Sequence, residues 1–173
     1  FIVVYGGASW VTAQRAGVGT LNFAWERHIP LIPWMIVPYL SIDLFFVAAP
    51  FLCSGDAERR LFSRRVAFSV LVAGACFLLI PFRFAYPRPV VEGPLGGLFR
   101  FLHGFDQPFN LFPSLHIALR TLLADLYGRH TRGPLRWVLL GWFSLIGFST
   151  VFTWQHHVLD VAGGFALAAL AFY

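Results

Sequence analysis

Long apolar stretches separated by short polar segments dominate the chain. About 20 apolar residues in a helix cross a bilayer core of about 30 Å, and on that scale the pattern predicts six spans, the first and last of them truncated. The predicted spans are 1–14, 31–53, 66–85, 111–128, 135–152 and 157–173. Because residues 137–173 are nearly unbroken in apolarity and too long for one span, we expect a turn near Thr153-Trp154-Gln155.

A shorter segment between the third and fourth spans has a different pattern. Residues 95–105 read LGGLFRFLHGF. This mixture of apolar and polar positions predicts a helix that lies in the membrane surface, although its glycines weaken the pattern.

The composition narrows the class of protein. Of the 173 residues, 58% are hydrophobic, 18% are aromatic and only 12% are charged, whereas a soluble domain carries about 25% charged residues. These values exclude a disordered chain, a coiled coil, a disulfide scaffold and most soluble enzymes. We expect an all-α polytopic membrane domain, a six-helix bundle that occupies residues 1–173. Because both ends fall inside apolar runs, we also expect a fragment of a longer chain.

The basic residues predict the orientation in the membrane. All 13 are arginines, and they form no basic face that could follow a nucleic acid. Seven of them lie in the loops 54–65 and 129–136, which by the positive-inside rule are cytoplasmic. The loop 86–110 and the turn 153–156 then lie on the opposite face, and the polar residues that could carry chemistry gather there.

The last turn holds the strongest candidate. In the string STVFTWQHHVLD, Ser149, His156 and Asp160 are spaced i, i+7, i+11. One helical turn separates His156 from Asp160, so the carboxylate can orient the imidazole and raise its basicity, as a nucleophilic histidine requires. A pair that only satisfies itself at a helix end is the alternative, but ionisable groups at the entry to an apolar span are usually functional.

A second candidate lies at the start of the fourth span, Phe112-Pro113-Ser114-Leu115-His116. We expect Pro113 in the first helical turn, where its missing N–H costs nothing. The N–H groups that follow and the Ser114 hydroxyl would form an anion site at the positive end of the helix dipole. His116 would stand beside it as a general acid; a simple helix cap is the alternative.

The third candidate is Arg88-Pro89, preceded by Arg83. Arginine can clamp a phosphoryl group with two hydrogen bonds and does not deprotonate. Taken alone, these residues would be interface arginines that reach toward the lipid headgroups. The order of the three patterns, all on one predicted face, favours a phosphoryl site.

This ordered set resembles the phosphatidic acid phosphatase type 2 (PAP2) superfamily of lipid phosphatases and phosphotransferases, whose pattern is K-x6-RP, PSGH and SR-x5-H-x3-D. The resemblance covers residues 30–165 or so, and its matches are Arg88-Pro89, Pro113, Ser114, His116, Ser149, His156 and Asp160. It implies a six-helix membrane fold with the site at the outer ends of the helices.

The resemblance also implies a role for each residue. His156 would attack phosphorus, and Asp160 would orient it. His116 would protonate the leaving alkoxide. The phosphoryl oxygens would be held by Arg88, Ser114 and Ser149. Arg83, five residues before Arg88, is not part of the family pattern and would supply a further cation in place of a missing one. We expect no metal and no other cofactor, because no second cluster offers ligands to join His156 and His157.

Two positions depart from the family pattern. Pro81 stands where the family has Lys, and Thr150 where it has Arg, so transition-state charge must be balanced otherwise. The string PSLH and the third motif without its Arg are similar to the branch of inositol phosphorylceramide and sphingomyelin synthases, which transfer a phosphorylated headgroup to a lipid alcohol. The sequence is also similar to the membrane half of bacterial proteins that fuse such a domain to a dual-specificity phosphatase, which implies a further C-terminal domain.

Three functions remain open. The first is a lipid phosphate phosphatase with a phosphohistidine intermediate, in a bacterial inner membrane with its site on the periplasmic face and with a lipid phosphate and membrane lipids as its partners. The second is transfer of a phosphorylated headgroup to a lipid alcohol or inositol. The third is a non-catalytic transporter or scaffold, suggested by a pair of intramembrane charges, Asp43 and Arg120; the inverted repeats of transporters are not visible.

Overall fold

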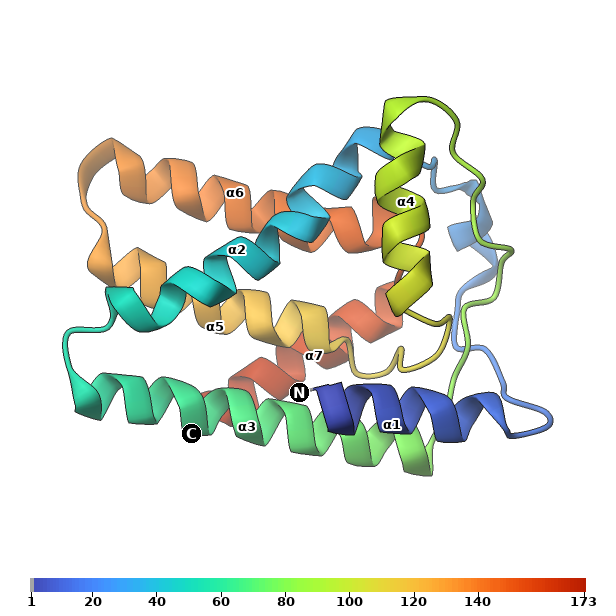
Figure 1. Ribbon diagram of the computed structural model, residues 1–173, viewed down its shortest axis with the longest axis horizontal. Coiled ribbons are helices and arrows are strands. Elements are labelled where there is room, and N and C mark those ends of the chain that lie inside the picture. The colour runs from blue at the N-terminus through green and yellow to red at the C-terminus, as the bar shows by residue number, and fades with distance from the viewer. Residues whose placement is uncertain (1) are drawn as a thin grey trace.

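The computed structural model describes residues 2–173, and within that range it is helical throughout apart from its loops and one isolated bridge between Gly19 and Phe82. The expected all-α membrane bundle is therefore confirmed (Figure 1). In chain order the helices are α1 (Ile2–Ala13), the 3₁₀ helices η1 (Ala24–His28) and η2 (Pro33–Met35), α2 (Ile36–Leu52), α3 (Asp56–Leu79), α4 (Pro94–Phe105), α5 (Leu115–His130), α6 (Gly133–Phe152) and α7 (Val158–Phe172).

The six predicted spans correspond to α1, α2, α3, α5, α6 and α7, and the predicted surface helix is α4. Among the described residues, three segments are long and apolar enough to cross a membrane, namely Pro33–Leu52, Asp56–Leu79 and Gly133–Phe152, and Val158–Phe172 is a shorter apolar helix. Large apolar side chains such as Leu44, Phe51, Leu79, Trp137 and Phe148 are exposed on the outside of the bundle. An apolar exterior of this kind is what a lipid-facing surface requires.

The third predicted span has the wrong bounds. α3 begins at Asp56 and ends at Leu79, whereas the sequence predicted a loop over 54–65 and a span over 66–85. Asp56 and Glu58 lie in the first turn, where acidic side chains stabilise the positive end of the helix dipole. Pro81 follows the helix and restricts the residue before it. Hydropathy marked the membrane-crossing part and missed the polar turns that precede it.

The fourth predicted span also starts too early. α5 begins at Leu115, and Ser114 is its N-cap, with an extended backbone and a side-chain oxygen that accepts a hydrogen bond from Ile117 N. Pro113 therefore precedes the helix instead of occupying its first turn, and the Phe112–Pro113 peptide bond is cis. The positive end of α5 consequently starts directly after the proline.

α5 is the central helix of the bundle. It packs against α2, α3, α6 and α7, and these neighbours bury its apolar residues almost completely, including Leu122, Leu123 and Leu126. The opposing core side chains include Phe143 and Ile146 of α6. A helix surrounded by other helices needs no lipid-facing side, which explains how α5 tolerates polar residues.

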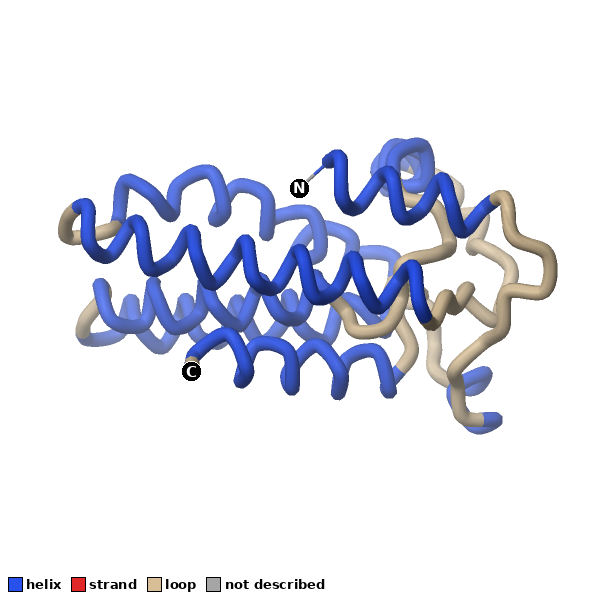
Figure 2. Tube along the Cα trace, turned by 90° about the horizontal axis from the view of Figure 1, so that it is seen from below, coloured by secondary structure: helices blue, strands red, loops and turns tan. Residues whose placement is uncertain are grey.

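The two ends of the bundle differ in their connections. Figure 2 shows short turns at one end and the long loops gathered at the other. α4 lies across the loop-bearing end (Figure 1), where Phe99 and Leu102 pack on Ile36 and Tyr39. At the short-turn end, Glu58 accepts hydrogen bonds from Arg129 (2.6 Å) and His130 (2.9 Å). The arginine-rich segments 54–65 and 129–136 and the sequence motifs therefore lie at opposite ends.

Close packing between α7 and the start of α5 gives a first prediction. A Cβ added at Gly164 would lie 2.5 Å from the Ser114 carbonyl oxygen and 2.7 Å from Ile117 Cβ. Because main-chain atoms cannot move aside without shifting α5, we expect Gly164→Ala to lower the free energy of unfolding by about 1–3 kcal/mol, measured by thermal unfolding in detergent.

Gly141→Ala is the matched control, because no described atom outside its own helix lies within 4 Å of the added Cβ. Alanine has the higher helix propensity, so this variant should be neutral or more stable by up to about 1 kcal/mol. Equal stability of the two variants would contradict the close packing of α7 against the start of α5.

Candidate active site

The sequence-predicted site residues come from three parts of the chain that meet at the loop-bearing end. Arg83 and Arg88 lie in the loop between α3 and α4. Ser114 and His116 lie at the start of α5, whereas Ser149 is in the last turn of α6. His156 lies in the turn between α6 and α7, and Asp160 lies in the first turn of α7.

The α6–α7 turn is held by main-chain hydrogen bonds. The Thr150 carbonyl accepts from the N–H groups of Gln155 (3.0 Å) and His156 (2.9 Å). Trp154 has a φ of 57°, in the left-handed region that a sharp reversal uses. His156 therefore precedes α7, and its position is set by the end of α6.

The His156 and Asp160 side chains face each other. His156 Nδ1 lies 3.6 Å from Asp160 Oδ2, and both side chains are buried. This distance is too long for a hydrogen bond, and His156 Nδ1 and Asp160 Oδ1 have no hydrogen-bond partner among the described residues. Catalytic hydrogen bonds often tighten only when substrate binds, so a small rotation of either side chain would complete the pair.

A main-chain hydrogen bond joins two of the motifs. Ser114 N donates to the Asp160 carbonyl at 3.0 Å, so the start of α5 is bonded directly to the first turn of α7. The Ser114 side-chain oxygen accepts from Ile117 N at 3.3 Å. It is thus a helix cap, and its own hydroxyl proton can still be donated to a ligand.

His116 lies in the first turn of α5. Its ring stacks on the Tyr39 ring with centroids 4.3 Å apart. Its Nε2 is buried and has no hydrogen-bond partner in the part of the chain that the structure describes. A buried imidazole nitrogen without a partner costs free energy, and a bound ligand could satisfy it.

Arg88 is anchored through main-chain carbonyls. Its guanidinium donates to the carbonyl oxygens of His103 (3.1 Å) and Asp106. Burial lowers the pKa of Arg88 from its ordinary value, and the negative charge of Asp106 opposes that change; a guanidinium still remains protonated. Two of its five N–H groups are used in this way, which leaves others for a ligand.

Two of the predicted phosphate ligands are bonded elsewhere. The Ser149 hydroxyl donates to the Ile146 carbonyl (2.7 Å) inside its own helix. Arg83 is exposed and donates from Nε to the Val18 carbonyl (3.1 Å). The structure therefore brings neither side chain into the group formed by Arg88 and His156.

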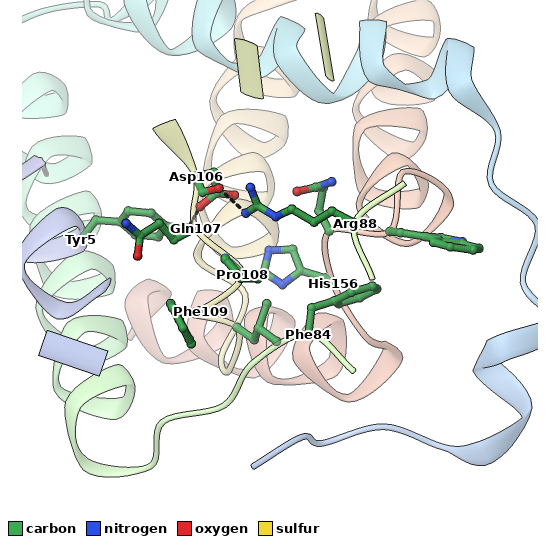
Figure 3. Close-up of a pocket in the computed structure, with 11 residues that line it drawn as sticks. Tyr5, Phe84, Arg88, Asp106, Gln107, Pro108, Phe109 and His156 are labelled. Atoms are coloured by element: carbon green, nitrogen blue, oxygen red, sulfur yellow. Dashed lines mark hydrogen bonds between the residues drawn. The ribbon is translucent and has the colours of Figure 1, made fainter. Parts of the chain in front are cut away.

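A pocket with an open volume of about 290 Å³ lies between these segments. Figure 3 shows the Arg88 guanidinium beside Asp106, with the His156 imidazole below them. Of the seven predicted residues, Arg88 and His156 line the pocket. A cation and an imidazole at one pocket can bind an anion and attack it.

Asp106 lines the pocket and was not predicted. It is the C-cap of α4, and its Oδ1 accepts a hydrogen bond from the Tyr5 hydroxyl of α1 at 2.7 Å. Burial raises the pKa of Asp106 above its ordinary value, and the Tyr5 hydrogen bond and the charges of His156 and Arg88 oppose that rise. A single Asp in a loop offers no sequence pattern by which this position could have been found.

Glu26 also escaped the sequence analysis. It is buried in η1, and its Oε2 lies 2.7 Å from His157 Nδ1. Oε2 also accepts from Val158 N at 3.3 Å, and Oε1 accepts from Phe23 N at 3.0 Å. The carboxylate therefore ties the connection before α2 to the start of α7.

The hydrogen bonds of His157 fix its tautomer. Ala85 N donates to His157 Nε2 at 3.1 Å, so Nε2 carries no proton, and Nδ1–H donates to Glu26. The ring also stacks on Phe84 with centroids 4.4 Å apart. His157 thus joins the α3–α4 loop to the α6–α7 turn, and both of its nitrogens are used.

The intramembrane charges that suggested a transporter are not paired in the described structure. Asp43 is exposed on α2. The Arg120 guanidinium lies instead over the Phe165 ring, 5.1 Å from its centroid, and approaches Gly147 of α6. Arg120 therefore contacts α6 and α7, whereas Asp43 is exposed on the outside of α2.

A family model described as the PAP2 superfamily matches residues 20–173. Neither the curated proteins nor the solved structures gave a match. The matched range includes all three motifs and leaves α1 outside. Within residues 2–173, no three His, Cys, Asp or Glu side chains gather as metal ligands would.

The buried His157–Glu26 contact gives a second prediction. His157→Phe keeps an aromatic ring against Phe84 but removes both side-chain hydrogen bonds, and it leaves the buried Glu26 carboxylate with its two main-chain donors alone. We expect the free energy of unfolding to fall by about 2–3 kcal/mol, measured by chemical unfolding in detergent. His28→Phe, at an exposed position, is the control. Unchanged stability of His157→Phe would show that the contact contributes nothing.

Proposed function

The chain belongs to the PAP2 superfamily, and on that basis we propose that it is an integral-membrane lipid phosphate phosphatase that works through a phosphohistidine intermediate. Membership indicates phosphatase or phosphotransferase chemistry. The observation that carries the proposal is that Arg88 and His156, from distant parts of the chain, line one pocket. The Ser114–Asp160 main-chain hydrogen bond, which joins the second motif to the third, supports it.

In the first step, His156 attacks phosphorus. Asp160 faces Nδ1 of His156 and would accept its proton in a hydrogen bond, which leaves the Nε2 lone pair for the attack. The Nε2–P bond forms as the P–O bond to the lipid breaks. The leaving alkoxide takes a proton from His116, which acts as the general acid.

In the second step, water replaces the lipid alcohol. Neutral His116 takes a proton from the attacking water as the oxygen bonds to phosphorus, and the P–N bond to His156 breaks. Inorganic phosphate leaves, His116 is protonated again, and His156 returns to its starting tautomer. Both histidines are therefore restored after each turnover.

Arg88 and the start of α5 would bind the phosphoryl oxygens. Arg88 retains N–H groups that the main chain does not use, and Ser114 can donate its hydroxyl proton at the positive end of the α5 dipole. This end of the helix would supply part of the positive charge that the motif Lys and Arg provide in other members of the family. Ser149 and Arg83 would have to leave their present carbonyl partners before they could bind phosphate.

The chain is a membrane protein by its family and its apolar helices. We propose that the arginine-rich end faces the cytoplasm, as the positive-inside rule requires. The pocket at the opposite end would then open on the periplasmic side of a bacterial inner membrane.

Headgroup transfer to a lipid alcohol is the second candidate, and the two neutral motif positions favour it. Pro81 lies in the same α3–α4 loop as Arg83 and carries no charge, and the Thr150 hydroxyl donates to the Gly147 carbonyl of its own helix. A site with fewer cations balances the single charge of a phosphodiester better than the double charge of a phosphomonoester. With a labelled donor lipid and an added lipid alcohol, free phosphate would indicate hydrolysis and a new phospholipid would indicate transfer.

The phosphohistidine mechanism gives a third prediction. His156→Ala removes the nucleophile, so release of phosphate from a lipid phosphate in detergent should fall by about 10⁴-fold or more. Vanadate, which imitates the pentacoordinate phosphorus, should inhibit the unaltered protein. His28→Ala is the matched histidine control and should keep full activity. Full activity of His156→Ala would contradict the mechanism.

A further inference from the structure

One pocket residue has the wrong charge for a site that binds only phosphate. The Asp106 carboxylate lines the pocket together with Arg88 and His156. A carboxylate close to a phosphoryl group repels it, and in a partly buried site that repulsion is weakly screened. Arg88 does not remove this charge through a side-chain ion pair, because it binds the main-chain oxygen of Asp106.

The carboxylate is held in a defined position. Asp106 N donates to the Leu102 carbonyl (2.9 Å) at the end of α4, and Oδ1 accepts from the Tyr5 hydroxyl (2.7 Å). A carboxylate has about four lone-pair positions, and the Tyr5 hydroxyl uses one of them, so Asp106, which lines the pocket, can accept further hydrogen bonds. Tyr5 lies in α1, outside the range 20–173 that the family model matches. The hydrogen bond that holds the Asp106 carboxylate therefore comes from a part of the chain that the family model does not match.

We propose that Asp106 is a specificity-determining residue that accepts a hydrogen bond from a hydroxyl or ammonium group carried by the substrate next to its phosphate. This rests on the proposed function of the pocket. Arg88 and His156 would take the phosphoryl group, and Asp106 would take the neighbouring donor. Figure 3 shows the arrangement that this requires, with Asp106 and Arg88 side by side above His156.

Charge and hydrogen bonding both favour such a substrate. A donor group turns the carboxylate from a repulsive neighbour into a binding partner, and charge-assisted hydrogen bonds are the stronger kind. A site built around a buried acceptor rejects ligands that lack the donor, because the acceptor is then left unpaired. The donor could belong to the lipid backbone or to the headgroup, and the substrates below separate these two sources.

The test compares two pairs of lipids in detergent. Sphingosine 1-phosphate carries an ammonium and a hydroxyl near its phosphate, and phosphatidic acid carries neither. Phosphatidylethanolamine carries an ammonium in its headgroup, and the quaternary ammonium of phosphatidylcholine has no N–H to donate. Release of the lipid alcohol gives kcat/KM for each lipid, and the ratio within each pair measures recognition of the donor.

Asp106→Asn removes the charge and keeps the shape. Because Arg88 binds the main-chain oxygen and Asn can still accept from Tyr5, this change leaves both anchoring contacts in place. We expect the wild type to prefer the donor-bearing lipid of at least one pair, and we expect Asp106→Asn to lower that ratio by about tenfold or more. Asp106→Glu keeps a carboxylate and should retain part of the preference. Glu92→Gln, an exposed carboxylate-to-amide change in the α3–α4 loop, should leave the ratio unchanged.

The outcomes separate this inference from the proposed function. A preference within the first pair would place the donor on the lipid backbone, and one within the second pair would place it on the headgroup. No preference in the wild type, or a ratio unaltered by Asp106→Asn, would overturn the inference while phosphate release continued. No release of lipid alcohol from any of the four lipids would contradict the proposed function itself.

Discussion

The hydrogen bond between His157 and Glu26 is the contact on which the geometry of the site depends. Three loops with little secondary structure meet at this end of the bundle, and an imidazole with both nitrogens engaged connects them. Nδ1–H donates to Glu26 in the connection before α2, and Nε2 accepts from Ala85 in the loop that carries Arg88. Because the pair is buried, water does not compete for it, and its loss would leave polar groups unpaired. This contact joins the turn that carries His156 to the loop that carries Arg88, in addition to the main-chain hydrogen bonds that anchor each residue.

The two adjacent histidines are thereby given different environments. His157 is neutral and fully bonded, so it has no lone pair or proton to contribute to a reaction. His156 has an unpaired Nδ1 that faces Asp160 at 3.6 Å, and its ring lines the pocket. Asp160 links the two, because its Oδ2 accepts from His157 N at 2.8 Å. The Asp160 carboxylate therefore lies against both His157, which supports the turn, and His156, the candidate nucleophile. A rigid turn can in this way hold a reactive side chain in place.

The helices of this protein were predictable from the periodic pattern of apolar residues, and the contacts between its loops were not. Hydropathy located six bundle helices, and the mixed apolar and polar pattern over 95–105 located the surface helix. The i, i+4 spacing predicted that His156 and Asp160 meet, and their side chains do face each other at 3.6 Å, although His156 precedes α7 instead of lying on it. The start of α3 at Asp56 was missed because polar helical turns outside the bilayer look like a loop to a hydropathy scale. Glu26 and Asp106 were missed because their partners, His157 and Tyr5, are more than 100 residues away in sequence. No local pattern encodes a contact between loops so distant in sequence.

The central claim is that His156 carries the phosphoryl group during turnover. Rapid quenching of the protein with a radiolabelled lipid phosphate, followed by peptide mapping, tests it most directly. We expect an acid-labile, base-stable label on the peptide that contains both histidines, with fragmentation placing it on His156 and not on His157. Turnover with no label on the protein, or with an acid-stable label on a hydroxyl side chain, would contradict the account.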